Sequence, residues 1–152
     1  GPDLWVCGRS DPAMRRAARL GDGWQPYMYT AEQFHDSVGK VKDFAAEAGR
    51  ELSDDFAFTS FIYVSMHEDV ETARNNAIEQ MTFRFNLPAE KIVDKYCAYG
   101  PDERIIKSLE TYVKAGANKL IVALIMPPEQ RMTYVERFAT NILSELQKMK
   151  VN

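Results

Sequence analysis

Three consecutive residues, Gly8, Arg9 and Ser10, have the types and the setting of an anion-binding turn. They follow a short apolar run, residues 4–7, and precede a segment with the composition of a helix. The first backbone N–H groups of a helix lack intrahelical partners, and the helix dipole favours negative charge there. Glycine lets an anion approach the backbone, and Arg9 adds a positive charge. The turn therefore predicts a phosphate or other anion site, although a purely structural turn explains the same residues.

The helix after this turn is marked at both ends. Ser10 or Asp11 can cap its start, Pro12 suits its first turn, and Gly21 suits its exit. Residues 3–27 therefore predict a strand, a tight turn, a helix and a second strand. This unit would position the candidate anion site.

The second strand begins at Asp22, Gly23 and Trp24, which we interpret as structural. Gly23 lets the strand begin tightly, and Trp24 supplies a large apolar side chain to the core. Three polar or aromatic residues near predicted strand ends can line a pocket, but such residues are more often solvated in loops. They are Gln25, Tyr27 and His67.

The composition limits the class of protein. The chain has 152 residues, of which 45% are hydrophobic and 27% charged, and this predicts a single globular domain over residues 1–152. The formal net charge of −3 argues against nucleic acid as a partner, because phosphate backbones require an excess of Lys and Arg. No apolar run is long enough to span a membrane, so no membrane partner is expected.

Two cysteines, Cys7 and Cys97, lie far apart in the sequence. They form no disulfide framework, and no Cys and His residues have the spacing of zinc ligands. We therefore expect no metal site and a reducing, cytoplasmic location. Cys97 would be reactive only if it were exposed beside a positive group.

Three further segments have clear periodicity. Thr30 and Gln33 form a capping-box pair ahead of a long helix. Residues 56–66 and 119–126 are apolar on both alternating faces, which is typical of strands covered on two sides. The apolar face of the long helix comprises Phe34, Val38, Val41, Ala45 and Ala48.

Two more helices are predicted towards the end of the chain. One opens at residues 100–102, and the other at a second capping-box pair, Thr133 and Glu136. Each has an apolar stripe at helical spacing. The stripes comprise Ile105, Leu109, Tyr112 and Val113 in the first, and Val135, Phe138, Ala139, Ile142 and Leu146 in the second.

Strands and helices alternate in this order, which predicts an α/β fold with four parallel strands layered with helices. Residues 67–99 interrupt the alternation as a helical insert that is either a lid or a decoration of the core. Its basic residues Arg74 and Arg84 are expected to be solvated. Its apolar residues are Val70, Ala73, Ala77 and Met81, with a second patch at Phe83, Phe85 and Leu87.

Four sequence motifs in this order resemble the carboxyl-terminal half of the luciferase-like monooxygenase family. They are LWVCGRS at residues 4–10, RRAARLGDGWQP at 15–26, GPDERIIKSLETYVKAGANKLIV at 100–122 and YVERFATNILSELQK at 134–148. The resemblance covers nearly the whole chain. It implies that the four strands and the insert form the C-terminal half of a (β/α)8 TIM barrel.

The resemblance also implies a function. The family uses reduced flavin mononucleotide (FMN) or a deazaflavin coenzyme for oxidoreductase or monooxygenase chemistry on small-molecule substrates. In the family, the turn that corresponds to Gly8, Arg9 and Ser10 helps to hold the cofactor phosphate. No catalytic residue is carried over. The alternative is a non-catalytic half-barrel that acts in binding or assembly, with Cys7 where many members have glycine.

The ends of the predicted sheet bear on assembly. Strands at residues 4–7 and 119–126 would have unpaired edges, which invite pairing with another chain. Most homo-oligomers have two-fold symmetry, and two four-stranded halves can close one barrel. We therefore expect a homodimer. The alternative is a monomer whose edges are covered locally, for example by residues 83–87.

Overall fold

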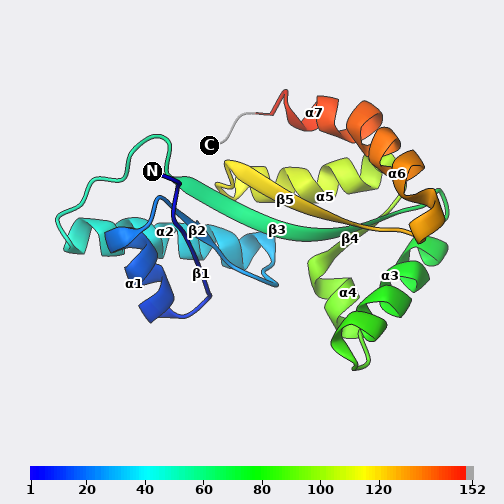
Figure 1. Cartoon of the computed structure of the whole chain (residues 1–152), viewed down its shortest axis with the longest axis horizontal. Helices are drawn as coiled ribbons and strands as arrows, with labels where there is room; N and C mark the ends of the chain where they lie inside the picture. Colours follow the sequence, from blue (N-terminus) through cyan, green and yellow to red (C-terminus); the bar gives the residue numbers. More distant parts are fainter. Residues whose placement is uncertain (150–152) are drawn as a thin grey trace. The chain divides into compact units, whose positions relative to one another are not determined.

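The computed structural model describes residues 1–149 of the chain (Figure 1). These residues divide into two compact units. Unit 1 contains residues 1–61 and 112–121, and unit 2 contains residues 62–111 and the described residues from 122 onward. The single domain predicted over residues 1–152 stays a prediction.

The strands of unit 1 are parallel, as predicted. β1 (Trp5–Cys7) pairs with β2 (Gly23–Gln25), which pairs with the start of β3 (Ala57–Met66). Gly23 lies opposite Ala57, and a Cβ atom on Gly23 would lie 2.7 Å from the Ala57 Cβ. This close approach explains why glycine begins the second strand.

Two helices, α1 (Asp11–Leu20) and α2 (Ala31–Glu47), lie side by side in unit 1 (Figure 1). The predicted capping box of α2 is formed: the Thr30 Oγ1 accepts from the Gln33 N–H at 3.2 Å, and the Gln33 Oε1 accepts from the Thr30 N–H at 3.0 Å. The predicted apolar face of α2 is buried except at Ala48, which is its exposed C-terminal cap.

The long strand β3 is buried along nearly all of its length, as predicted for a strand covered on both faces. β5 (Lys119–Ile125) pairs with it. The Asn118 amide joins them, because its Nδ2 donates to the Phe56 carbonyl and its Oδ1 accepts from the Phe58 N–H, both at 2.9 Å. The prediction that both faces of β5 are covered is wrong, since most of its residues are half-buried.

The insert of unit 2 contains α3 (Val70–Phe85), α4 (Glu90–Tyr96) and a strand, β4 (Cys97–Gly100). β4 pairs in parallel with the end of β3, so among residues 1–149 the sheet has five strands rather than the four predicted. The predicted helical insert over residues 67–99 therefore ends in a strand. Four residues are too few to show a strand periodicity in the sequence.

The apolar residues of the insert divide into a buried and an exposed set. Ala73, Ala77 and Met81 are buried, as their helical spacing predicts. The second predicted patch contributes little to the core, because Phe83 is 88% exposed and Leu87 is 43% exposed.

The last two helical segments show one correct and one incorrect prediction. α5 (Asp102–Lys114) buries the predicted stripe, including Ile105 and Leu109. The final segment starts earlier than predicted, with a 3₁₀ turn at η1 (Pro128–Gln130) followed by α6 (Arg131–Arg137). It continues as a π-helix, η2 (Phe138–Leu143), and α7 (Ser144–Leu146).

The predicted capping box of the final helix is wrong, since Thr133 lies inside α6 rather than at its start. Pro128 begins the helical segment instead, because its fixed backbone angle suits a first helical turn. Of the predicted apolar stripe, only Ile142 is buried. Among residues 1–149, no helix has the length and apolar character needed to cross a membrane.

Candidate functional site

The turn between β1 and α1 has the backbone conformation that only glycine adopts readily. Gly8 has φ +133°, and a Cβ atom there would lie 2.7 Å from the Ala13 Cβ. Its N–H donates to the Gln25 carbonyl at 3.2 Å, and its carbonyl accepts from the Trp24 Nε1 at 2.9 Å. Both backbone polar groups of Gly8 are therefore hydrogen-bonded to residues of β2.

Arg9 is held beside this turn by the loop that follows β2. Its guanidinium donates to the Met28 carbonyl at 3.1 Å and lies 5.9 Å from the centre of the Tyr29 ring. The Tyr29 hydroxyl donates to the Arg9 carbonyl at 3.3 Å, and the Ser37 hydroxyl donates to the Tyr29 oxygen. These contacts hold the exposed Arg9 guanidinium beside the turn.

Ser10 is the N-cap of α1, as one of the two predicted options. Its Oγ accepts from the Ala13 N–H at 3.4 Å. Within residues 1–149, the backbone N–H groups of Arg9, Ser10 and Asp11 have no hydrogen-bond acceptor. Three consecutive backbone donors of the turn are therefore unpaired within the described residues.

One acidic side chain, that of Asp11, would repel an anion bound at this turn. The Asp11 carboxylate lies in the first turn of α1, with a Lys40 ammonium 3.5 Å away. Both side chains are more than half exposed, so their interaction is screened by solvent. The donor set at Gly8, Arg9 and Ser10 still fits a phosphate, because it combines a guanidinium, a hydroxyl and free backbone N–H groups.

Asp22 and Trp24 have the structural roles predicted for them. The Asp22 Oδ2 accepts from the Leu4 N–H at 2.8 Å, which ties the chain ahead of β1 to β2. Trp24 is fully buried and packs its ring 5.5 Å from that of Phe34. These contacts fix the position of the Gly8 turn.

The weaker candidates each have local contacts. Gln25 is half-buried in β2, and the Tyr27 ring packs 5.6 Å from Phe61. The His67 Nδ1 accepts from the Asp69 N–H at 3.0 Å in a local turn of unit 2. Among the described residues, no group of three His, Cys, Asp or Glu side chains could hold a metal ion.

Cys97 and Arg74 also have structural surroundings. Burial, with a smaller contribution from Asp94, raises the pKa of the Cys97 thiol to about 12, so it is not a thiolate at neutral pH. The Arg74 Nε and Nη2 donate to the two Asp94 oxygens at 2.7 and 2.9 Å. Arg74 therefore joins α3 to α4.

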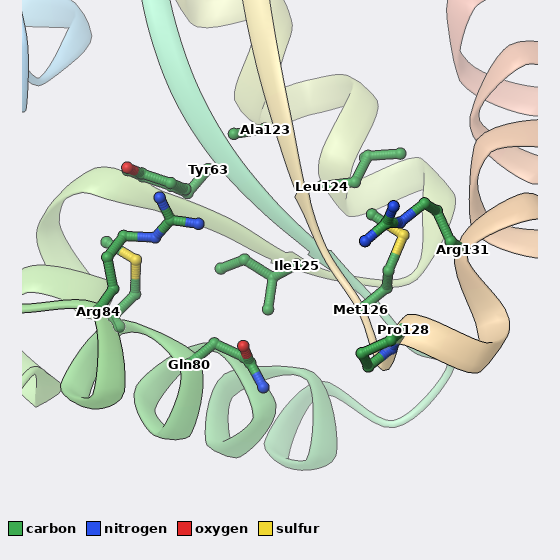
Figure 2. Close-up of a pocket in the computed structure, with 10 residues that line it drawn as sticks. Tyr63, Gln80, Arg84, Ala123, Leu124, Ile125, Met126, Pro128 and Arg131 are labelled. Carbon is green, nitrogen blue, oxygen red and sulfur yellow. The ribbon is translucent and has the colours of Figure 1, made fainter.

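A pocket of about 300 Å³ lies within unit 2 (Figure 2). Its lining residues come from β3, α3, β5 and the segment that leads into α6. No pattern in the sequence predicted this pocket, and Arg84 was expected only to be solvated. Arg84 is exposed, but it also lines the pocket together with Tyr63, Gln80, Ile125, Met126 and Arg131.

The parallel strands alternate with helices and define an α/β protein. The model of the luciferase-like monooxygenase family matches residues 1–91, which is more than half of the chain. The chain therefore belongs to the luciferase-like monooxygenase family. No curated protein sequence matches it.

Solved structures confirm the fold. A coenzyme F420 dependent tetrahydromethanopterin reductase from Methanopyrus kandleri is 15% identical, with a TM-score of 0.72 over 93% of this chain and 50% of its own. An F420-dependent secondary alcohol dehydrogenase is 17% identical, with a TM-score of 0.75 over 95% of this chain and 48% of its own.

A third structure, a riboflavin lyase with modified FMN and riboflavin, is 11% identical and has a TM-score of 0.67. It matches 97% of this chain and 43% of its own. The chain thus spans about half the length of these three proteins. Their identities are low, so the likeness establishes the α/β half-barrel fold alone.

Proposed function

We propose that the chain is a segment of a flavin- or deazaflavin-dependent oxidoreductase and that its β1–α1 turn holds the cofactor phosphate. The observation that carries this proposal is the set of three unpaired backbone N–H groups at Arg9, Ser10 and Asp11, within residues matched by the family model. Two of the similar structures are named for coenzyme F420 and a third contains modified FMN, which supports a cofactor of this type.

Each residue of the turn would contribute to phosphate binding in a different way. Gly8 has no side chain that could block the approach of an anion to the turn. The Arg9 guanidinium has further N–H groups besides the one that donates to the Met28 carbonyl. The Ser10 hydroxyl accepts from Ala13 and keeps its own proton to donate. A bound cofactor would supply the redox chemistry, and the chain would orient it and its small-molecule substrate.

The test compares FMN with riboflavin, which has the same ring system without the phosphate. A ligand that binds only the folded state raises the melting temperature by mass action. We expect FMN to raise the melting temperature more than riboflavin at equal concentration. The same comparison applies to a deazaflavin coenzyme and its dephosphorylated form.

Two variants locate the phosphate. Arg9→Gln should weaken FMN binding about tenfold, the effect of losing one charged hydrogen bond. Arg19→Gln is the matched control, because Arg19 is exposed at the other end of α1. Equal stabilisation by riboflavin and FMN, or an equal loss in both variants, would overturn the phosphate role.

The alternative function is a non-catalytic half-barrel for binding or assembly. It predicts no thermal shift with either cofactor at millimolar concentration. Absorbance of the purified protein and turnover of reduced cofactor in air separate the two proposals. Cofactor-dependent substrate oxidation by this chain would reject the non-catalytic alternative.

We also propose that two copies pair through their strand edges and complete a barrel as a homodimer. In the described residues, β1 pairs only with β2, and β5 pairs only with β3, so each has an unpaired edge. Light scattering coupled to size exclusion should give twice the mass of one chain. The mass of a single chain over a wide concentration range, with a cooperative melt, would reject the dimer.

A further inference from the structure

Four of the five arginines of unit 2 fall into two groups, and the fifth, Arg104, lies over the Tyr99 ring and does not line the pocket. Arg74 pairs with Asp94 and Glu71, and Arg137 pairs with Asp102 and Glu68. Within residues 1–149, Arg84 and Arg131 have no carboxylate partner. These two arginines line the same pocket, and no Asp or Glu lines it with them.

The pocket places the two cations apart. Arg84 and Arg131 lie on opposite sides of Ile125 in the close-up view (Figure 2). The Arg84 guanidinium lies 5.6 Å from the centre of the Tyr63 ring, which limits its motion through a cation–π contact. Arg131 is the first residue of α6 and follows the 3₁₀ turn.

Apolar side chains line part of the pocket between the two cations. Met81 is 1% exposed and Ile125 is 7% exposed, and both line the pocket with Met126. Gln80 is the uncharged polar group on the α3 side.

The volume and the charge of the pocket limit the kind of ligand that it could bind. A cavity of about 300 Å³ is at the small end of the range for ligand pockets, so the ligand is small. Glu79 lines a separate cavity of about 60 Å³ beside the pocket, where it would repel an anion that extended that far. A metal cation is disfavoured, because two guanidiniums line the larger pocket.

We propose that this pocket binds a small organic dianion, with its apolar body against Met81 and Ile125 and one anionic group at each of Arg84 and Arg131. A guanidinium donates two parallel hydrogen bonds to a carboxylate, so each end has a matching group. The pocket lies in unit 2 and the proposed phosphate site lies in unit 1. The inference therefore does not depend on the proposed cofactor role.

The experiment titrates the full chain with α,ω-dicarboxylates from adipate to sebacate by calorimetry, without flavin. Each length is compared with its monocarboxylate and its uncharged diol. We expect one length to bind best and to exceed both comparators by about tenfold or more, since the loss of one charged hydrogen bond costs about this factor.

Variants then assign the two ends. Arg84→Gln and Arg131→Gln should each weaken the best dicarboxylate about tenfold and leave its monocarboxylate bound by the remaining arginine. Arg104→Gln is the matched control, because Arg104 is also exposed on a unit 2 helix and stacks over a tyrosine, Tyr99, at 5.0 Å. It should leave binding unchanged.

Four outcomes would overturn the proposal. They are no binding by any dicarboxylate, a diol that binds as well as the diacid, a loss in only one arginine variant, and an equal loss in Arg104→Gln. None of them bears on FMN binding at the Gly8 turn. A thermal shift with FMN but none with the dicarboxylates would reject this inference and leave the cofactor proposal standing.

Discussion

The two units use their arginines differently. In unit 1, Arg9 donates to the Met28 carbonyl, and Arg50 donates to the Ala18 and Gly21 carbonyls at the end of α1. In unit 2, Arg74 and Arg137 bind carboxylates on other elements. Unit 1 also has an arginine on a carboxylate, since Arg15 on α1 binds Glu47 on α2 at 2.6 Å. The difference is therefore that Arg9 and Arg50 of unit 1 satisfy backbone carbonyls near helix ends and loops, whereas Arg74 and Arg137 of unit 2 bind only carboxylates.

The two units also differ in the side chains that they bury. Unit 1 packs aromatic rings closely, with Trp24 against Phe34 and Phe56 against Phe58. The helix α3 of unit 2 buries smaller side chains, Ala73, Ala77 and Met81. We therefore expect single substitutions to cost most in unit 1, and the following predictions test this difference.

The largest effect is expected at Trp24. Trp24→Ala should cost about 3–5 kcal/mol, because it removes a fully buried ring and its hydrogen bond to the Gly8 carbonyl. Trp5→Ala is the matched control, since Trp5 is only half-buried in β1. Urea unfolding followed by circular dichroism measures both. Equal losses in the two variants would contradict the buried role of Trp24.

Met81 gives the corresponding test in unit 2. Met81→Ala should cost about 2–5 kcal/mol, while Met132→Ala should cost little because Met132 is 65% exposed. Both tryptophans lie in unit 1, so their fluorescence follows that unit, whereas circular dichroism follows the helices of both. β3 and β5 each have residues in both units, so we expect the two signals to shift together. Separate transitions would reject the proposed single domain.

Gly23 tests the close strand approach in unit 1. Gly23→Ala should cost about 1–3 kcal/mol, because the new Cβ would lie 2.7 Å from the Ala57 Cβ and 2.8 Å from its carbonyl oxygen. Gly39→Ala on α2 is the control, since a Cβ there meets nothing within 4 Å. It should stabilise the helix slightly. Thermal melts of both variants decide the outcome.

A smaller effect separates the two predicted capping boxes. Thr30→Ala should cost about 1 kcal/mol, because Thr30 caps α2. Thr133→Ala should change stability by less than about 0.5 kcal/mol, because Thr133 lies exposed inside α6 and caps nothing. Chemical unfolding of both variants at one pH measures the two changes in stability. An equal loss in the two variants would show that Thr133 acts as a cap in solution.

These two threonines show which features the sequence could predict. The cap at Thr30 is a local interaction over three residues, and α2 follows from it and from the apolar spacing. The same pattern at Thr133 failed, because the 3₁₀ turn from Pro128 starts the helical segment earlier. Local patterns therefore predict a helix well, but a neighbouring element can move its start.

The missed strand and pocket depend on contacts between distant residues. β4 is a strand because Cys97 pairs with Tyr63, and four residues give no periodicity of their own. Arg84 and Arg131 line one pocket although they are far apart in the sequence, and neither segment contains a pattern that predicts this. The turn at Gly8 was predictable as a shape, because glycine, a cap residue and a helix follow one another. Its ligand is still a prediction.

The smallest effect concerns one ion pair of unit 2, between Arg74 and Asp94. Hydrogen bonds from Arg74 hold the pKa of Asp94 below its ordinary value of 3.8. Since the folded pKa is lower than the unfolded one, the pair stabilises the fold above the unfolded pKa, and this contribution disappears as the pH falls through the folded pKa. Asp94→Asn should therefore lower the melting temperature slightly at pH 7.

The difference between the two proteins should narrow towards pH 2, because protonation then removes the same charge from the unmodified protein. The shift stays small because Arg74 and Asp94 are near the surface, where water screens the pair. Asp43→Asn on α2 is the control, since Asp43 is exposed and has no ion pair in the described residues. A loss at pH 7 that persists undiminished at pH 2 would mean that Asp94 acts through packing or its hydrogen bond to Tyr99 rather than through charge.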